Sequence, residues 1–187
     1  RDRIRWNTAG SGRFTAVGVV HAFLSALRAR GIKPEGCTAR VDGLGSVGFS
    51  VFELLAGHGV IVDAVRNRYG SIRNRNGIDP ADQKAHLRGE EKRITSYPGA
   101  GEIDRDEFFA RPAAAVFPGA LSFSISREDA EKTGAEMIVP GANAPFGPGA
   151  REVLQRRGIV EIPDFVANAG GVLGGAFAFG GLGAPAA

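Results

Sequence analysis

The apolar residues of this chain alternate between a helical period and short continuous runs. Between positions 17 and 27 they recur every three or four residues, which predicts a helix that ends at Gly31. Residues 38–41 and the β-branched run 60–65 predict two strands, and the segment 47–55 between them predicts a second helix. The first third of the chain therefore predicts the order helix, strand, helix, strand.

The alternation continues through the rest of the chain with weaker signals. Residues 66–77 predict a polar turn region, and Asp79 followed by Pro80 predicts the start of a helix. Residues 89–105 are expected to be mostly loop. Further strands are predicted at 113–117, 137–139 and 159–162, and further helices at 126–132, where Ser126 and Asp129 suit a capping box, and near 149–157.

Short apolar strands separated by amphipathic helices favour parallel pairing through right-handed crossovers. We therefore expect an α/β fold with a Rossmann-like, doubly wound parallel sheet in three α/β/α layers. Residues 15–175 are expected to form this dinucleotide-binding domain, residues 1–14 an N-terminal arm or linker, and residues 176–187 a flexible tail rich in Gly and Ala. Ligands of such sheets bind beyond the carboxyl ends of the strands, so functional residues are sought in the segments that follow strands.

Composition narrows the class of protein further. The 28 glycines in 187 residues disfavour a helical bundle, because a glycine inside a helix costs about 1 kcal/mol relative to alanine, and 43% hydrophobic residues disfavour disorder. The lone Cys37 allows no disulfide within the chain and fits a cytoplasmic protein. The net charge of +3 predicts no nucleic-acid partner, no segment predicts a membrane span, and no spacing of histidines predicts a metal site. Because the chain begins at Arg1, we expect it to be part of a longer protein.

Residues 43–48 form a G-x-G-x-x-G sequence between a predicted strand and a predicted helix. The first glycine would permit a tight turn, the second would let a pyrophosphate approach the backbone, and the third would let helix and strand pack closely. The helix start would offer free N–H groups and a partial positive charge to the phosphates. A turn that binds nothing is the alternative, but the strand–helix–strand context favours a dinucleotide. The residues expected to contact the cofactor here are Gly43, Gly45, Ser46, Val47 and Gly48.

The end of the second predicted strand bears on the choice of cofactor. Nineteen residues after Gly48 stands Asn67, between Arg66 and Arg68. A carboxylate there would accept hydrogen bonds from the adenosine ribose, whereas guanidinium groups pair with a 2′-phosphate. We therefore expect NADP rather than NAD, unless both arginines face solvent. Asp63 is the rival acid, but it falls inside the strand, where it is expected to point away from the ribose.

Several short motifs follow one another along the chain. They are residues 15–20 (TAVGVV), 43–48 (GLGSVG), 76–79 (NGID), 118–121 (PGAL), 141–145 (GANAP) and 162–172 (IPDFVANAGGV). This set, from about Gly12 to Phe177, resembles the NAD(P)-binding, C-terminal domain of the glutamate/leucine/phenylalanine/valine dehydrogenase family.

The resemblance implies reversible oxidative deamination of an L-amino acid to a 2-oxo acid and ammonia, with hydride transfer to NADP or NAD. In that family a separate N-terminal domain carries the substrate pocket, a catalytic lysine and a catalytic aspartate, and nothing in this chain resembles that domain. The chain is thus expected to bind cofactor, to hold no catalytic residue and to be inactive alone, within a parent that is a homo-oligomer. By the same resemblance Gly119 and Ala120 contact the cofactor, and Thr15, Asn143 and Asn168 lie near the nicotinamide ribose, the carboxamide or the substrate.

Phe123, Pro140 and Gly175 depart from the family pattern. They leave open a second hypothesis, a dinucleotide-binding or regulatory module without catalysis. A third, nucleic-acid binding through the arginines near position 70, predicts a steep dependence of binding on salt. Asp164, after the last predicted strand, is interpreted as a helix N-cap rather than a general base.

Overall fold

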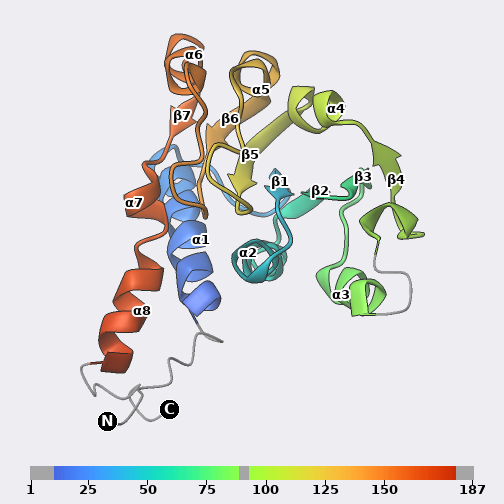
Figure 1. The fold of residues 1–187 in the computed structure, drawn as a ribbon, viewed down its shortest axis with the longest axis horizontal. Helices are drawn as coiled ribbons and strands as arrows, with labels where there is room; N and C mark the ends of the chain where they lie inside the picture. The colour runs from blue at the N-terminus through green and yellow to red at the C-terminus, as the bar shows by residue number, and fades with distance from the viewer. Residues whose placement is uncertain (1–10, 89–92, 180–187) are drawn as a thin grey trace.

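The computed structural model describes residues 11–88 and 93–179, so the expected arm and the end of the expected tail lie largely outside the described residues. Figure 1 shows the elements in space. In chain order they are α1 (Ser11–Ala29), β1 (Thr38–Asp42), α2 (Ser46–Gly57), β2 (Ile61–Asn67), β3 (Gly70–Arg73), α3 (Pro80–Arg88), the 3₁₀ helix η2 (Ile94–Ser96), β4 (Gly101–Ile103), α4 (Arg105–Ala110), β5 (Pro112–Pro118), α5 (Arg127–Lys132), β6 (Gly134–Ile138), α6 (Ala150–Arg156), β7 (Val160–Glu161), α7 (Asp164–Ala167) and α8 (Gly170–Phe179).

The described strands form one sheet in the order β4-β3-β2-β1-β5-β6-β7. From β2 to β7 the neighbouring strands are parallel, and the order reverses between β1 and β5. This confirms the Rossmann-like, doubly wound α/β fold. One feature corrects the expectation of a purely parallel sheet, because β3 and β4 extend the β2 edge in antiparallel pairing.

Helices cover both faces of the sheet, with α1 and α2 on one side and α4, α5 and α6 on the other (Figure 1). Successive side chains of a strand point to opposite faces. In β5, Ala115 and Phe117 accordingly pack with α1 and α2, whereas Val116 packs with α4, α5 and α6. Burial of a large apolar side chain contributes about 1.5–3 kcal/mol, so each face has its own stabilising core. No helix of the described ranges is long and apolar enough to cross a membrane.

The local signals for helix starts are confirmed where side chains cap the backbone. Asp79 accepts the N–H groups of residues 81 and 82 ahead of α3. Ser126 accepts the N–H of Asp129 at 3.1 Å, and Asp129 accepts the N–H of Ser126 at 2.7 Å, which completes the predicted capping box of α5. Asp164 is the exception, because it is the first residue of α7 and Pro163 occupies the N-cap without a side-chain hydrogen bond.

The predicted turn region 66–77 and loop region 89–105 are both partly wrong. The first contains β3, and the second contains η2, β4 and the first residue of α4. Strand β3 has only four residues and β4 only three. Each strand contains one glycine and one isoleucine, and its other residues are polar. The backbone of β3 pairs with the free edge of β2, and β4 then pairs with β3. This pairing depends on tertiary contacts, which the local sequence pattern does not reveal.

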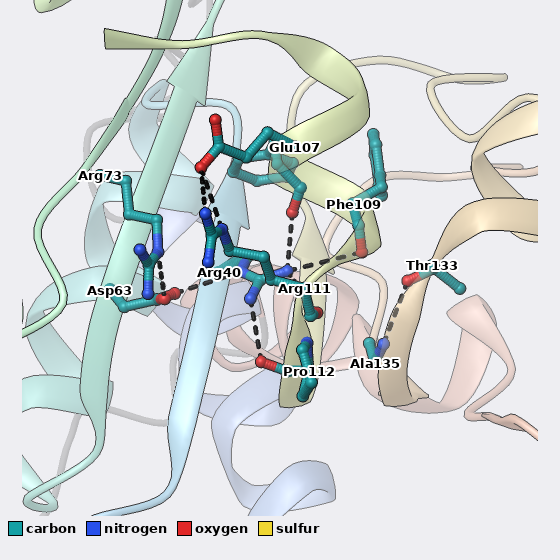
Figure 2. Close-up of polar contacts among 10 residues, drawn as sticks. Arg40, Asp63, Arg73, Glu107, Phe109, Arg111, Pro112, Thr133 and Ala135 are labelled. Carbon is teal, nitrogen blue, oxygen red and sulfur yellow. Dashed lines mark hydrogen bonds and ion pairs between the residues drawn. The ribbon is translucent and has the colours of Figure 1, made fainter. Parts of the chain in front are cut away.

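A buried arginine lies in the middle of β1. Only 1% of Arg40 is exposed, and its Nε donates to Asp63 Oδ1 in β2 at 3.2 Å (Figure 2). Asp63 Oδ2 accepts a second bond from Arg73 Nε in β3 at 2.9 Å. Burial lowers the pKa of Arg40, and the charge of Asp63 opposes this shift. Both oxygens of Asp63 are thus engaged by arginines within the sheet.

The remaining N–H groups of Arg40 bind backbone carbonyls of the segment that joins α4 to β5 (Figure 2). Nη1 donates to the carbonyls of Phe108 and Arg111 at 2.8 and 2.7 Å, and Nη2 donates to that of Pro112 at 2.9 Å. The last carbonyls of a helix lack intrahelical partners. Arg40 therefore provides hydrogen-bond donors for carbonyl groups at the C-terminal end of α4. One side chain thus connects β1, β2, α4 and β5.

Replacing Arg40 with methionine should therefore be strongly destabilising. The variant keeps the length of the side chain but leaves the buried Asp63 with Arg73 alone and several carbonyls unpaired. We expect the free energy of unfolding, measured in urea, to fall by about 3–5 kcal/mol. Arg30→Met is the control, because Arg30 pairs with Glu136 at the surface and should contribute less than about 1 kcal/mol. Equal stability of the two variants would contradict the structural role of Arg40.

Candidate functional site

A pocket of about 760 Å³ opens at the carboxyl ends of the central strands. Its walls are residues 42–45, 66–69 and 119–124, with Arg105. The first two segments follow β1 and β2, and the third follows β5, so the pocket lies beside the point where the strand order reverses. Ligands of doubly wound sheets bind at this position.

The glycine turn between β1 and α2 is packed tightly at its two ends and open in its middle. Gly43 has a φ of +108°, and a Cβ on it would lie 2.6 Å from the backbone nitrogen of Ala120. A Cβ on Gly48 would lie 1.8 Å from the carbonyl oxygen of Gly43. A Cβ on Gly45 would meet no atom of the described residues within 4 Å. The first and third glycines are thus required by the chain itself, whereas the second leaves space beside the backbone.

Helix α2 begins at this turn without a side-chain cap. Gly45 is its N-cap, and no side chain of residues 11–88 or 93–179 caps the N–H groups of its first turn. Those groups have no partner within the helix and carry a partial positive charge. Ser46 is exposed, and Val47 lies against Gly141, since a Cβ on Gly141 would be 2.9 Å from Val47 Cγ1. The start of α2 can therefore bind an anion.

A buried carboxylate that sequence reasoning missed lines the pocket beside the glycine turn. Asp42 is 2% exposed, its Oδ1 accepts from Arg66 Nη1 at 2.8 Å, and its Oδ2 has no partner within the described ranges. Burial raises the pKa of Asp42, and the charges of Arg66 and Arg105 oppose that shift. The sequence could have indicated this residue, because Asp42 directly precedes the first glycine of the turn, Gly43. Arg66 is consequently engaged at one N–H, while its other donors have no partner in the described structure.

The other two arginines of the pocket differ in their partners. Arg105 pairs with Asp129, its Nε donating to Oδ1 at 2.8 Å. Burial alone would raise the pKa of Asp129, but hydrogen bonds from Arg105 and from the capping box bring it below its usual value. Arg68 is exposed and has no carboxylate partner in the part of the chain described. It lies 4.7 Å from the ring centroid of Tyr69 and donates to the Tyr69 hydroxyl at 2.6 Å.

Two predicted amides lie together at the same edge of the sheet, outside the pocket wall. Asn168 Nδ2 donates to Asn143 Oδ1 at 2.7 Å, and the hydroxyl of Ser122 donates to the Asn143 carbonyl at 2.8 Å. Asn143 follows β6, and Asn168 is the C-cap of α7. Asp164, predicted as an N-cap, instead accepts the N–H of Ala144 through Oδ2 at 2.7 Å. The loops after β5, β6 and β7 are thereby linked.

Two residues of these loops have strained backbones. Phe123 and Ala144 have φ values of +57° and +45°, and the N–H of Phe123 donates to the Ala144 carbonyl at 2.8 Å. A left-handed conformation costs a residue other than glycine about 1–3 kcal/mol and persists only where its surroundings hold it. Phe123 is 66% exposed, between the pocket and the Asn143 loop.

The remaining expected residues divide between the pocket and its surroundings. Gly119 and Ala120 line the pocket with Asn67, whose Oδ1 accepts the N–H of residue 69. Thr15 does not line it; its Oγ1 would lie 2.5 Å from a Cβ on Gly171 in α8. Arg105 and Tyr69 were missed because they fall in a segment expected to be loop and in one expected to be turn.

Comparison with known proteins supplies the family. The model of the Glutamate/Leucine/Phenylalanine/Valine dehydrogenase family matches residues 9–180. A glutamate dehydrogenase of Thermotoga maritima is 36% identical over 148 residues, which are 79% of this chain and 35% of that protein. The crystal structure of a Plasmodium falciparum glutamate dehydrogenase is 26% identical with a TM-score of 0.76, over 87% of this chain and 37% of that one.

A third protein is similar to this chain in its fold alone. L-tryptophan dehydrogenase from Nostoc punctiforme is 22% identical with a TM-score of 0.68, over 92% of this chain and 48% of that one. The chain thus spans about a third of the length of the Thermotoga protein and less than half of the two structures. Since the family model covers nearly all of its residues, the chain belongs to the glutamate/leucine/phenylalanine/valine dehydrogenase family.

Proposed function

We propose that this chain is the domain that binds the nicotinamide dinucleotide in an amino-acid dehydrogenase. The observation that carries the proposal is the turn 43–48, where an uncapped helix start and open space at Gly45 adjoin a pocket of about 760 Å³. A diphosphate needs N–H donors and close approach to a backbone, and this turn offers both. The phosphates would bind at the turn and the adenosine in the pocket.

The pair Asn143 and Asn168 suits the other end of the cofactor. The single hydrogen bond between their side chains leaves the amide NH₂ of Asn143, one N–H of Asn168 and the amide oxygen of Asn168 without a partner in the described structure. Exchanging the oxygen and nitrogen of both side chains gives the same result. A carboxamide offers one acceptor and one donor, so this pair can bind the carboxamide of nicotinamide.

The reaction we propose is oxidative deamination of an L-amino acid to a 2-oxo acid and ammonia, with the bound nicotinamide accepting the hydride. This chain would hold and orient the cofactor, and the acid–base groups would come from another domain of a longer, homo-oligomeric cytoplasmic protein. Closure between the domains would exclude water and bring the substrate Cα hydrogen close to the ring. The related proteins named as glutamate dehydrogenases support an amino acid as substrate.

NADP is the cofactor we favour, because of the charges beside Asn67. Arg68 has no carboxylate partner in the described ranges, and Arg66 keeps donors beyond the one bound to Asp42. Both line the pocket. Guanidinium groups form charge-assisted, bidentate hydrogen bonds with phosphate, so both can contribute to binding a 2′-phosphate.

A second candidate function is a dinucleotide-binding module without catalysis. It is favoured by the exposed, strained Phe123 and by Gly175, where an added Cβ would meet no atom of the described residues within 4 Å, since neither residue offers a polar group to a substrate. The sequence that precedes Arg1 in the parent would discriminate. A glycine-rich motif that carries a lysine supports the dehydrogenase, and its absence supports the module.

Gly45→Ala tests the phosphate site directly. The new methyl group meets no atom of the described residues, so the temperature of thermal unfolding should fall only slightly, by the lower preference of an N-cap for alanine than for glycine. The methyl group nevertheless occupies the space beside the backbone that a diphosphate would need. We expect calorimetric titration to show NAD⁺ and NADP⁺ binding weakened by about tenfold or more. Gly57→Ala, at the last residue of the same helix and also in open space, is the matched control and should bind as the wild type does. Failure of the wild-type chain to bind either nucleotide at millimolar concentration would refute the proposal.

Arg68→Ala tests the choice of cofactor. We expect NADP⁺ affinity to fall by about tenfold while NAD⁺ affinity changes by less than about twofold, because only NADP⁺ carries the 2′-phosphate. Arg66→Ala should show the same preference with an added loss of stability, since it leaves Asp42 buried and unpaired. Arg75→Ala, an exposed arginine outside the pocket, is the control. Equal losses for both nucleotides would rule out recognition of the 2′-phosphate.

If the acid–base groups belong to another domain, this chain alone should not catalyse the deamination of an amino acid. It should bind cofactor in the titration above, yet produce no NADH or NADPH absorbance with any L-amino acid, because none of its residues is assigned an acid–base role. Deamination by the isolated chain would show that it contains the catalytic groups itself.

A further inference from the structure

The short helix α7 is tied at both ends to the loop that follows β6. At its first residue, Asp164 Oδ2 accepts the N–H of Ala144 at 2.7 Å. At its C-cap, Asn168 Nδ2 donates to Asn143 Oδ1, also at 2.7 Å. One helical segment therefore contacts two consecutive loop residues, one through its backbone and the other through its side chain.

The peptide group between Asn143 and Ala144 is held at both of its polar atoms. Its carbonyl oxygen accepts from the Ser122 hydroxyl at 2.8 Å, and its N–H donates to Asp164. A peptide group held at one polar atom can still rotate through the flanking ψ and φ angles. Held at both, it can rotate only by breaking a hydrogen bond, so its orientation is determined by Ser122 and Asp164 together.

Ala144 requires such a restraint because its φ is +45°, where an alanine is strained. Rotation of the preceding peptide group would relieve the strain and would turn the backbone that carries the Asn143 side chain. The bond to Asp164 opposes this rotation, and a bond to a carboxylate is about twice as strong as one between neutral groups. Asp164 forms no ion pair within the ranges described, although the charge of Arg151 lies near enough to interact with it.

We propose that Asp164 is a positioning residue for the carboxamide end of the cofactor. By holding the peptide between Asn143 and Ala144, it keeps the Asn143 side chain against Asn168. The unused donor and acceptor of that pair then stay at a fixed separation before the ligand arrives, which lowers the entropy lost on binding. Asp164 touches no part of the cofactor in this role. The inference rests on the proposed cofactor-binding function and adds the residue that sets the geometry of its nicotinamide end.

The test compares two ligands that differ only in the nicotinamide. Wild type, Asp164→Ala and Asp164→Asn are titrated with NAD⁺ and with ADP-ribose, and in parallel with the 2′-phosphorylated forms of both. Asp164→Ala should bind NAD⁺ about tenfold more weakly and ADP-ribose within about twofold of wild type, because only NAD⁺ carries the carboxamide. Asp164→Asn keeps a side-chain oxygen that can accept the Ala144 N–H, so it should retain most of the affinity.

Two results would overturn the positioning role. One is an Asp164→Ala variant that binds NAD⁺ as wild type does, and the other is an equal loss for NAD⁺ and ADP-ribose, which indicates a general structural defect. Should Asp164→Ala fail to fold, as thermal unfolding would show, Asp164→Glu keeps the charge but shifts the carboxylate by one methylene away from the Ala144 N–H, and it should give the same selective loss. A wild-type chain that binds ADP-ribose and NAD⁺ equally overturns this inference alone. A wild-type chain that binds neither overturns the proposed function and this inference with it.

Discussion

The guanidinium of Arg40 joins parts of the chain that are far apart in sequence. From the central strand it reaches Asp63 on one neighbouring strand and the backbone that links α4 to β5 on the other side. Taking a charge out of water costs several kcal/mol unless partners compensate, so the segments that supply those partners must keep their positions. The loop that follows β5 forms one wall of the pocket, and Asp42 lies two residues further along β1. The contacts of Arg40, which lie deeper in the sheet, therefore help to hold the strands that carry the pocket.

The three glycines of the turn between β1 and α2 differ in how closely other atoms approach them. Gly43 and Gly48 are needed because the backbone approaches itself or Ala120 too closely for a side chain, whereas no atom of the described residues fills the space at Gly45. The arginines of the pocket show a similar division. Those paired with Asp42 and Asp129 are restrained by buried carboxylates, and Arg68 has no carboxylate partner among the described residues. Rigid packing thus surrounds the few groups left available to a ligand.

Signals contained within a few residues could be predicted from the sequence, and those created by tertiary contacts could not. The glycine turn and the capping box at Ser126 are local, and both form as predicted. Strands β3 and β4 have no pattern of their own and exist because β2 has an edge to pair with. Asp164 illustrates the same limit within the site, because the residue type suits an N-cap but the loop after β6 offers a competing donor. Which partner wins depends on distances that the sequence does not contain.

The sheet ends in very short strands on both sides, β4 with three residues and β7 with two. A strand at an edge exposes unpaired backbone groups, and long ones recruit further chains into a growing sheet. Here so few groups are left at either border that another copy could add hardly any main-chain hydrogen bonds. Assembly into an oligomer would therefore rely on side chains rather than on main-chain pairing at β4 and β7.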